Sequence, residues 1–527
     1  MSQWDTLNRR GFLRLSGLGV ATLFAGPLVS GCTSAEQATA IPTTTTADVE
    51  IALQAMRGEV SILPGKATRV WTYQGQVTKG DPASLQTLPG SYLGPILRVR
   101  KGQTVRIAFT NNLPEQSIVH WHGLHVPDDM DGHPRHAIGP GQTYVYQFQV
   151  LNRAGTYWFH PHPHKITGPQ VYKGLAGLFL VSDEEEMAAG LPSGEYDIPL
   201  IIQDRTFDAN NQLLYLPGGM MDQMMGFLGD RILVNGQPDF VLPVATRPYR
   251  LRLLNGSNSR IYKLSWEDGT PLTVIATDGG LLEKPAQRSY VTLAPAERVE
   301  LWVDFGGRSL GSELRLQSLA FAGAEAGDMG MMMRRSPALA DGSEFTVLRV
   351  RVAQESEEKQ ALPARLSTIL RYRLEDAINR ETPRDFTITM RRMLWTINGR
   401  TFEMDSVAED EEVRLNTLEV WEFINQPGSM GMGMMSSMAE EMAHPMHIHG
   451  PQFQVIGREV RPDMTANWET VSAGYVDEGW KDTVLMMPGE RVRLLMKFED
   501  FTGLYLYHCH NLEHEDLGLM RNYRVTA

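Results

Sequence analysis

The histidines of this chain gather in two stretches of its sequence. All 14 of them lie between residues 120 and 164 or between residues 444 and 514 of the 527-residue chain. Four pairs are separated by a single residue, at positions 120 and 122, 160 and 162, 447 and 449, and 508 and 510, and His164 follows His162 at the same spacing. Residues i and i+2 of a strand project to the same face, so each pair can point at one site. Four converging pairs would offer eight imidazoles, a donor set that suits copper, zinc or iron.

The last cluster also contains a thiol. Cys509 stands between His508 and His510, and on a strand its side chain points to the opposite face from theirs. Together with His444 and His514, Cys509 would supply two imidazoles and one thiolate, the ligand set of a blue-copper electron-transfer site. One strand could then serve a metal site on each face, joined by the short covalent route from Cys509 to its neighbours. A zinc site is an alternative from the last cluster alone, but four histidine pairs around one thiol favour copper.

Short strands must position these residues. Past residue 49 the chain consists mostly of short alternating segments broken by Gly, Pro and Asn, a pattern typical of β-sandwiches. Two elements recur in the same order in each third of the chain: residues 102–111, echoed at 247–255 and 418–425, and residues 140–148, echoed at 295–303 and 488–496. The repeat predicts an all-β chain with three homologous domains of about 150 residues each. We place them at 49–183, 196–353 and 384–527, and the second contains no histidine.

Composition and charge exclude several classes of protein. Hydrophobic residues make up 42% of the chain and charged residues 21%, which is ordinary for a globular protein and excludes a disordered tail, a polytopic membrane protein and a collagen-like fibre. The net charge is −13, from 49 Lys and Arg against 62 Asp and Glu. Phosphate binding needs clustered Lys and Arg, so this diffuse acidic balance argues against a nucleic acid partner.

The N-terminus resembles an export signal. Twin arginines at 9–10 precede an apolar run at 15–29, which is too short to span a bilayer. The run ends in Val-Ser-Gly-Cys at Cys32, which resembles a lipobox; a plain signal peptide is the alternative. We therefore expect a twin-arginine signal peptide at 1–31, a flexible tether at 32–48 rich in Thr, Ser and Ala, and a periplasmic protein attached to the membrane only through a lipid on Cys32.

As a set, the motifs of this chain closely resemble those of the multicopper oxidases, over nearly the whole of its length after the signal. Among these it is most similar to the bacterial three-domain copper-efflux (cuprous) oxidases. The resemblance rests on residues 120–124, 158–162, 174–177, 278–282, 444–450, 480–484 and 508–516. It implies three cupredoxin-like Greek-key β-sandwich domains in tandem, with a cluster of three coppers between the first and the third.

The resemblance also implies a role for each metal ligand. Four copper ions are expected: a type 1 copper at His444, Cys509 and His514, a type 2 copper at His120 and His447, and a type 3 pair at His122, His160, His162, His449, His508 and His510. Asp131 and Glu515 match acidic residues that deliver protons for O₂ reduction, and a solvated or structural carboxylate is the alternative for Asp131. The other four histidines match no ligand, and we expect surface or supporting positions for them: His125, His133, His136 and His164.

One position departs from the copper-efflux pattern. Ten residues after the cysteine stands Leu519, where that branch places a weak axial methionine. Met520 follows one residue later, and on a regular strand it would point away. Leucine at this position resembles high-potential laccases, which puts the substrate in doubt but not the reaction.

Methionines are concentrated in three patches. They are Met220, Met221, Met224 and Met225; Met329, Met331, Met332 and Met333; and Met430, Met432, Met434, Met435, Met438, Met442 and Met446. Core packing is the default explanation of such a group. The Gly-rich context favours exposed thioethers, which are soft ligands that select Cu(I). Met442 and Glu440 match positions where cuprous oxidases bind the substrate ion.

The sequence thus predicts an oxidase that takes electrons singly at the type 1 copper and reduces O₂ to water at the cluster of three. Cu(I) oxidation in copper tolerance is the preferred activity, and laccase-type oxidation of phenols or aromatic amines is the alternative. A non-catalytic exported copper-binding or cell-division scaffold is the alternative from another class, although the complete ligand set argues against it. We expect a monomer.

Overall fold

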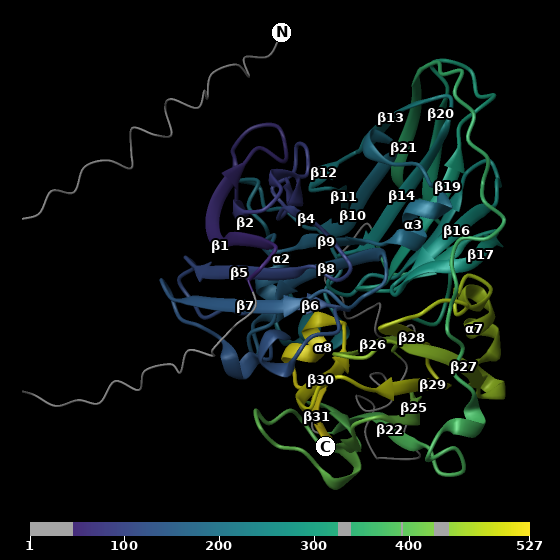
Figure 1. The fold of residues 1–527 in the computed structure, drawn as a ribbon. Coiled ribbons are helices and arrows are strands. Elements are labelled where there is room, and N and C mark those ends of the chain that lie inside the picture. The colour runs from purple at the N-terminus through teal and green to yellow at the C-terminus, as the bar shows by residue number, and fades with distance from the viewer. Residues whose placement is uncertain (1–45, 325–338, 392–393, 426–441) are drawn as a thin grey trace, which may run out of the picture. The chain divides into compact units, whose positions relative to one another are not determined.

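The computed structural model describes residues 46–324, 339–391, 394–425 and 442–527. Within these residues the chain forms six β-sheets, two in each third of the sequence (Figure 1). The signal peptide, Cys32, Glu440 and the methionines from 329 to 333 and from 430 to 438 lie outside the described residues. The boundaries proposed for the domains stay predictions.

The first third contributes two sheets that share one apolar core. The first has the order β2-β1-β5-β7, formed by β1 (Val49–Val60), β2 (Thr68–Lys79), β5 (Thr104–Asn111) and β7 (Thr143–Gln149). The second has the order β3-β4-β9-β8-β6, formed by β3 (Leu85–Gln86), β4 (Ile96–Arg100), β6 (Val119–His122), β8 (Gly155–Pro161) and β9 (Gly177–Ser182). Ile107 of β5 packs with Trp121 of β6 and Phe159 of β8 in this core. Burial alternates strictly along β5, as expected for a strand with one face in the core.

The middle third forms the largest pair of sheets. One has the order β12-β11-β10-β14-β19-β16-β17, formed by β10 (Asp197–Arg205), β11 (Arg231–Val234), β12 (Gln237–Pro238), β14 (Pro248–Asn255), β16 (Leu272–Thr277), β17 (Gly280–Arg288) and β19 (Arg298–Asp304). The other has the order β13-β21-β20-β15-β18, formed by β13 (Val241–Ala245), β15 (Tyr262–Trp266), β18 (Val291–Leu293), β20 (Glu313–Ser318) and β21 (Phe345–Gln354). Leu251 of β14 and Leu264 of β15 belong to their common core.

The last third repeats this arrangement. One sheet has the order β23-β22-β25-β29-β27, formed by β22 (Arg384–Arg391), β23 (Leu394–Ile397), β25 (Thr417–Ile424), β27 (Phe453–Val460) and β29 (Glu490–Phe498). The other has the order β24-β31-β30-β26-β28, formed by β24 (Glu412–Arg414), β26 (His444–Ile448), β28 (Thr483–Met486), β30 (Gly503–Cys509) and β31 (Met520–Thr526). Their shared core includes Trp421 of β25 and Tyr507 of β30.

The sequence repeat corresponds to one recurring strand pairing. Its first element forms β5, β14 and β25, and its second forms β7, β19 and β29. In each third the two strands pair antiparallel, and the first also pairs in parallel with the strand that opens the sandwich, namely β1, β10 or β22. The prediction of an all-β chain of tandem sandwiches is confirmed.

Helices are short and serve as connections. They are α2 (Thr167–Tyr172), α3 (Glu184–Ala189), α4 (Met220–Met225), α7 (Thr465–Ser472) and α8 (Leu512–Asp516). Single 3₁₀ turns are η1 (Pro82–Ser84), η2 (Asp128–Met130), η3 (Pro134–His136), η4 (Gly194–Tyr196), η5 (Leu374–Asp376), η6 (Glu409–Glu411) and η7 (Pro462–Met464). In the part of the chain that the structure describes, no helix is long and apolar enough to cross a membrane.

Strand β8 joins the first sandwich to the middle one. All seven of its residues are buried, because neighbouring side chains enter different cores. Phe159 packs inside the first sandwich, whereas Trp158 packs with Ile201 of β10 and Leu254 of β14. His160 of β8 lies beside Trp158, and its Nε2 atom is 3.4 Å from Nε2 of His510, which directly follows β30 of the last third. The site therefore lies where strands from distant parts of the chain meet.

Candidate metal centre

Two pairs of adjacent strands carry the histidine pairs. In the first third β6 and β8 pair antiparallel with His120 opposite His160, and in the last third β26 and β30 pair with His447 opposite His508. These registers place histidines of neighbouring strands side by side, as cross-strand partners on one face. The second member of three pairs follows directly after its strand, at His162, His449 and His510.

The structure brings these eight residues together as one histidine cluster. We use that name for His120, His122, His160, His162, His447, His449, His508 and His510. Three triads, of which the first two share His122, have nitrogens within 4.8 Å of one another, and every member is buried: His120, His122 and His447; His122, His160 and His510; and His162, His449 and His508. Each triad draws on the first and the last third of the chain, so neither part could form the cluster alone.

His120 and His447 are oriented so that both could bind one cation between their rings. The Nδ1 atom of His120 donates to the main-chain oxygen of Asp131 at 2.7 Å, and Nδ1 of His447 donates to the main-chain oxygen of Asp482 at 2.8 Å. A neutral imidazole that donates through Nδ1 carries a lone pair on Nε2. The two Nε2 atoms are only 3.4 Å apart. Two buried lone pairs that face each other are stabilised when a metal ion accepts both.

Nε2 atoms also face one another at five further histidines of the cluster. Nδ1 of His160 donates to the main-chain oxygen of Pro161 at 2.9 Å, and its Nε2 lies 3.4 Å from Nε2 of His510. Nδ1 of His508 donates to the main-chain oxygen of Cys509 at 3.1 Å, and its Nε2 lies 3.3 Å from Nε2 of His162 and 3.1 Å from Nε2 of His449. The cluster is therefore a set of converging imidazole lone pairs, which suits copper.

Burial keeps seven of these eight rings neutral. It lowers the pKa of His160 to about 4 and that of His162 to about 3, because a charged imidazole would lose its hydration. The pKa is lowered by the same cause at His120, His122, His447, His449 and His510. A metal ion binds the neutral form, so these seven histidines are ready to bind without first losing protons.

Cys509 enters a second site on the other side of its strand. Its Sγ atom is 3.5 Å from Nδ1 of His444 and 3.9 Å from Nδ1 of His514, and all three residues are buried. We call these three residues the Cys509 site. The Nε2 atom of His514 donates to the main-chain oxygen of Met224 at 3.0 Å, which leaves the Nδ1 lone pair facing the sulfur. The arrangement offers two imidazoles and one sulfur to one metal ion.

Apolar side chains surround the Cys509 site. The ring of Trp395 lies 4.7 Å from that of His444 and 4.6 Å from that of His514, between centroids. Leu519 is fully buried in the same apolar cluster as Cys509, whereas Met520 packs in another one with Phe402. Burial raises the pKa of the Cys509 thiol, so a metal ion must displace its proton.

The first methionine patch forms helix α4 beside this site. Met220 is 60% exposed and Met221 is half-buried, but Met224 and Met225 lie in the core that contains Cys509. Met442 and Met446 are buried in that core too. The expectation of exposed thioethers is therefore wrong for these four residues, because α4 packs against the core of the last sandwich and Met442 and Met446 are part of that core. On α4, Met220 is the methionine that is exposed to solvent.

Two acidic residues touch the histidine cluster. Asp131 accepts from Nδ1 of His449 through Oδ2 at 2.7 Å, and burial raises the pKa of Asp131 well above its usual value. The carboxylate of Glu515, on α8, lies 3.2 Å from Nδ1 of His508 and 3.7 Å from Nε2 of His162. Both are placed to exchange protons with the rim of the cluster.

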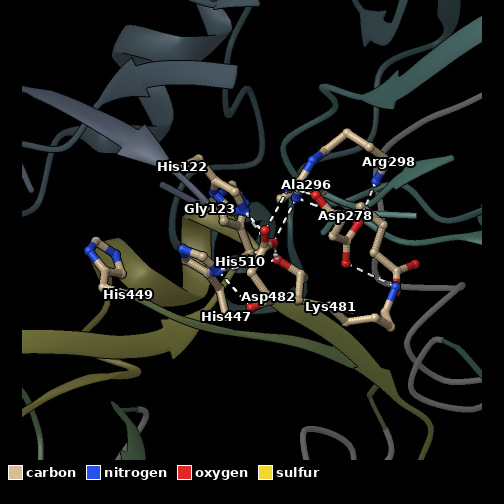
Figure 2. Close-up of polar contacts among 12 residues, drawn as sticks. His122, Gly123, Asp278, Ala296, Arg298, His447, His449, Lys481, Asp482 and His510 are labelled. Atoms are coloured by element: carbon tan, nitrogen blue, oxygen red, sulfur yellow. Dashed lines mark hydrogen bonds and ion pairs between the residues drawn. The ribbon is translucent and has the colours of Figure 1, made fainter. Parts of the chain in front are cut away.

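The four remaining histidines join none of these groups. His125 lies 3.0 Å from a carboxylate oxygen of Asp500, and His133 lies 2.9 Å from the amide oxygen of Asn522. His136 accepts from the Arg135 side chain, and His164 packs beside Phe402. Sequence reasoning missed the contacts of Asp482, which reaches both His122 and His447 (Figure 2). The motif at 480–484 signalled this residue without giving it a role.

Comparison with known proteins gives the same picture. The family model described as multicopper oxidase matches residues 69–186, and a second model of that description matches residues 377–527. The chain is 32% identical to the multicopper oxidase mco of Staphylococcus aureus over 451 residues, which cover 85% of each protein. It is also 30% identical to the cell division protein FtsP of Photorhabdus laumondii, over 97% of each protein.

A solved structure shares the fold over nearly the whole chain. The crystal structure of the McoA multicopper oxidase of Aquifex aeolicus has a TM-score of 0.73 to this structure and 36% sequence identity. The match covers 92% of this chain and 97% of that one. The two family-model matches include the strands that carry the histidine cluster and the Cys509 site.

Proposed function

The chain belongs to the multicopper oxidase family, and on this premise we propose that it oxidises Cu(I) at the Cys509 site and reduces O₂ to water at the histidine cluster. Membership makes it a copper-dependent oxidoreductase that uses O₂. The observation that carries the proposal is that Nε2 atoms of the cluster face one another in pairs. Two of these histidines, His508 and His510, are the chain neighbours of Cys509. We assign one copper to the Cys509 site, one to His120 and His447, and two to the other six histidines.

Bound copper would supply one-electron redox chemistry, linking substrate oxidation at the Cys509 site to oxygen reduction at the cluster. The residues of the chain do the rest. Cys509 has His508 and His510 as its chain neighbours, which gives a short covalent path between the two sites. The buried strands exclude bulk water from both sites. Main-chain oxygens fix the rings of His120, His447 and His160 so that they present Nε2.

Proton supply is assigned to the two carboxyl groups. Asp131, whose pKa is raised by burial, can hold a proton on Oδ1, because its Oδ2 accepts from Nδ1 of His449. Glu515 lies beside His162 and His508. A carboxyl group within hydrogen-bond reach of the reacting centre can act as a general acid, which the reduction of O₂ to water requires.

The preference for Cu(I) over phenols rests on helix α4. Its main chain accepts the hydrogen bond from His514, and its first residue, Met220, holds an exposed thioether. Thioethers are soft ligands that select Cu(I), so the start of α4 can capture this ion next to the site that takes its electron. Copper tolerance is the physiological role that such an activity would serve.

Parallel oxygen-uptake assays with Cu(I) and with a phenol test this proposal. Replacing Met220 and Met221 by Leu should lower kcat/KM for Cu(I) and leave phenol oxidation unchanged. Met187→Leu is the matched control, because Met187 is 55% exposed on α3, away from the Cys509 site. Deleting residues 430–438 should act in the same direction as the α4 variant.

The outcomes separate the alternatives. Equal loss of both activities would indicate a structural role for α4, and phenol oxidation with no measurable Cu(I) oxidation would establish the laccase alternative. Copper-reconstituted protein with neither blue absorbance nor oxygen uptake would indicate a scaffold.

We also propose that the protein is exported, monomeric and anchored through Cys32. Mass spectrometry of the N-terminal peptide from membranes tests the lipid, and its absence there would refute the anchor.

A further inference from the structure

Arg298 reaches the histidine cluster from the part of the chain that has no histidine. It opens strand β19 of the middle third and is fully buried. Nε donates to the main-chain oxygen of Thr156 at 2.9 Å, and the two terminal nitrogens donate to the main-chain oxygens of Ala296 and Asp278, both at 3.0 Å. The remaining donors meet the two carboxylate oxygens of Asp482 at 2.7 and 2.5 Å. All five N–H groups of the guanidinium are therefore used.

Asp482 connects this guanidinium to the cluster. Its Oδ1 atom lies 3.1 Å from Nε2 of His122, and its main-chain oxygen accepts from Nδ1 of His447 at 2.8 Å. The hydroxyl of Thr483 donates to the same Oδ1 at 3.0 Å and lies 3.2 Å from Nε2 of His122. Both oxygens that face Nε2 of His122 are thus available only as acceptors. Figure 2 shows the arrangement, with Arg298 and Asp482 beside His122 and His447.

The other buried charges leave this pair intact. Lys481 binds Asp278 at 2.9 Å and Glu297 at 3.0 Å, so a second cation serves those two carboxylates. Arg298 forms two parallel hydrogen bonds with one carboxylate, that of Asp482. Such a fork fixes the plane of the carboxylate as well as its charge, which a lysine could not do.

The orientation of His122 follows from these contacts. A paired carboxylate can only accept, so His122 must donate through Nε2 and carry its lone pair on Nδ1. Among the described residues, Nδ1 of His122 is buried and has no hydrogen-bond partner. His120 and His447 have the opposite arrangement, since they donate through Nδ1. The ring of His122 must therefore present a different nitrogen to the cluster.

We propose that Arg298 is a positioning residue of the histidine cluster, which acts through Asp482 to fix the Nε2–H tautomer of His122 and to aim its Nδ1 lone pair at the metal. The middle third would thereby control a metal site to which it contributes no ligand. The identity of the metal rests on the proposed function, but the tautomer is a property of the metal-free chain and is tested without copper.

The first test is NMR of the metal-free protein labelled with ¹⁵N-histidine. The imidazole signals of His122, assigned by their loss in His122→Asn, should show a protonated Nε2 and an unprotonated Nδ1. In Asp482→Asn the amide can donate as well as accept, so a mixture of both tautomers is expected. A protonated Nδ1 at His122 in the unmodified protein would overturn the proposal.

The second test measures copper affinity. Partners that orient a ligand typically contribute 10- to 100-fold to metal affinity. We expect Arg298→Lys to lower the affinity of the cluster by about 10-fold or more, with the blue absorbance of the Cys509 site retained. The matched control is Arg252→Lys, because Arg252 is a buried arginine on the neighbouring strand β14 that grips Asp197 with two hydrogen bonds.

These results are distinguishable from a failure of the proposed function. If the protein binds copper but oxidises no substrate, the tautomer and affinity results still stand. If Arg298→Lys and Arg252→Lys have the same affinity and His122 keeps its tautomer in Asp482→Asn, Arg298 is only a structural residue and the proposal fails.

Discussion

The number of protons released when copper binds to the metal-free protein should rise only slightly on acidification, because most of the proposed histidine ligands are buried and neutral. A metal ion binds unprotonated imidazole, so every histidine that is protonated beforehand must release its proton on binding. Burial lowers the pKa of eight of the ten proposed histidine ligands. At His160, for example, burial lowers the pKa to about 4.

The magnitude follows from these shifts. An imidazole of ordinary pKa, about 6.5, is about 10% protonated at pH 7.5 and about 90% protonated at pH 5.5. Ten such histidines would therefore release about eight more protons at the lower pH. With eight of them kept neutral by burial, the increase should be fewer than about two. The Cys509 thiol, whose pKa is raised, adds one proton at either pH and cancels from the difference.

A pH-stat titration measures this quantity directly, as the base needed to hold pH while copper is added. Circular dichroism of the metal-free protein at both pH values provides the control that the chain stays folded. An increase near eight protons would refute the conclusion that the cluster is a buried set of converging lone pairs. The same linkage predicts that these histidines destabilise the metal-free fold as pH falls below about 6.5, because the unfolded chain then binds protons that the native one excludes.

Three substitutions test individual roles. Cys509→Ser should abolish blue absorbance and oxidase activity while the histidine cluster keeps its copper, and a blue, active variant would contradict the assignment. Leu519→Met should lower the reduction potential of the blue site, since a thioether donates weakly to Cu(II); its packing cost should stay below about 1.5 kcal/mol. An unchanged or higher potential in a redox titration would mean that Leu519 is not axial. Asp131→Asn should lower kcat for oxygen uptake by about 100-fold or more with the blue band intact, and an unchanged kcat would remove Asp131 from proton delivery.

Much of the site could be predicted from the sequence, because side chains alternate between the two faces of a strand. The two-residue spacing predicted that His508 and His510 share one face of a strand and Cys509 the other. In the structure Cys509 meets His444 and His514, while its neighbours enter the histidine cluster. The repeat of two strand elements likewise predicted three equivalent sandwiches, because each copy needs the same antiparallel pair.

Other features depend on contacts between distant residues and leave no local pattern. Arg298 and Asp482 are 184 residues apart, and neither has a neighbour whose spacing reveals the pair. The tautomer of each histidine depends on which main-chain oxygen or carboxylate lies behind its ring. The Gly-rich context predicts exposed thioethers at Met220, Met221, Met224 and Met225, but Met224 and Met225 are buried because they lie on helix α4, which packs against α8 beside His514.

The number of electrons delivered to each O₂ tests the central claim most directly. It is measured by following Cu(I) oxidation and oxygen uptake together in the copper-loaded protein, with an assay for hydrogen peroxide. The proposed arrangement predicts four Cu(I) ions oxidised for each O₂ consumed and no peroxide, because a joined pair of sites stores and delivers single electrons until water forms. Two Cu(I) ions for each O₂, with peroxide released, would contradict it.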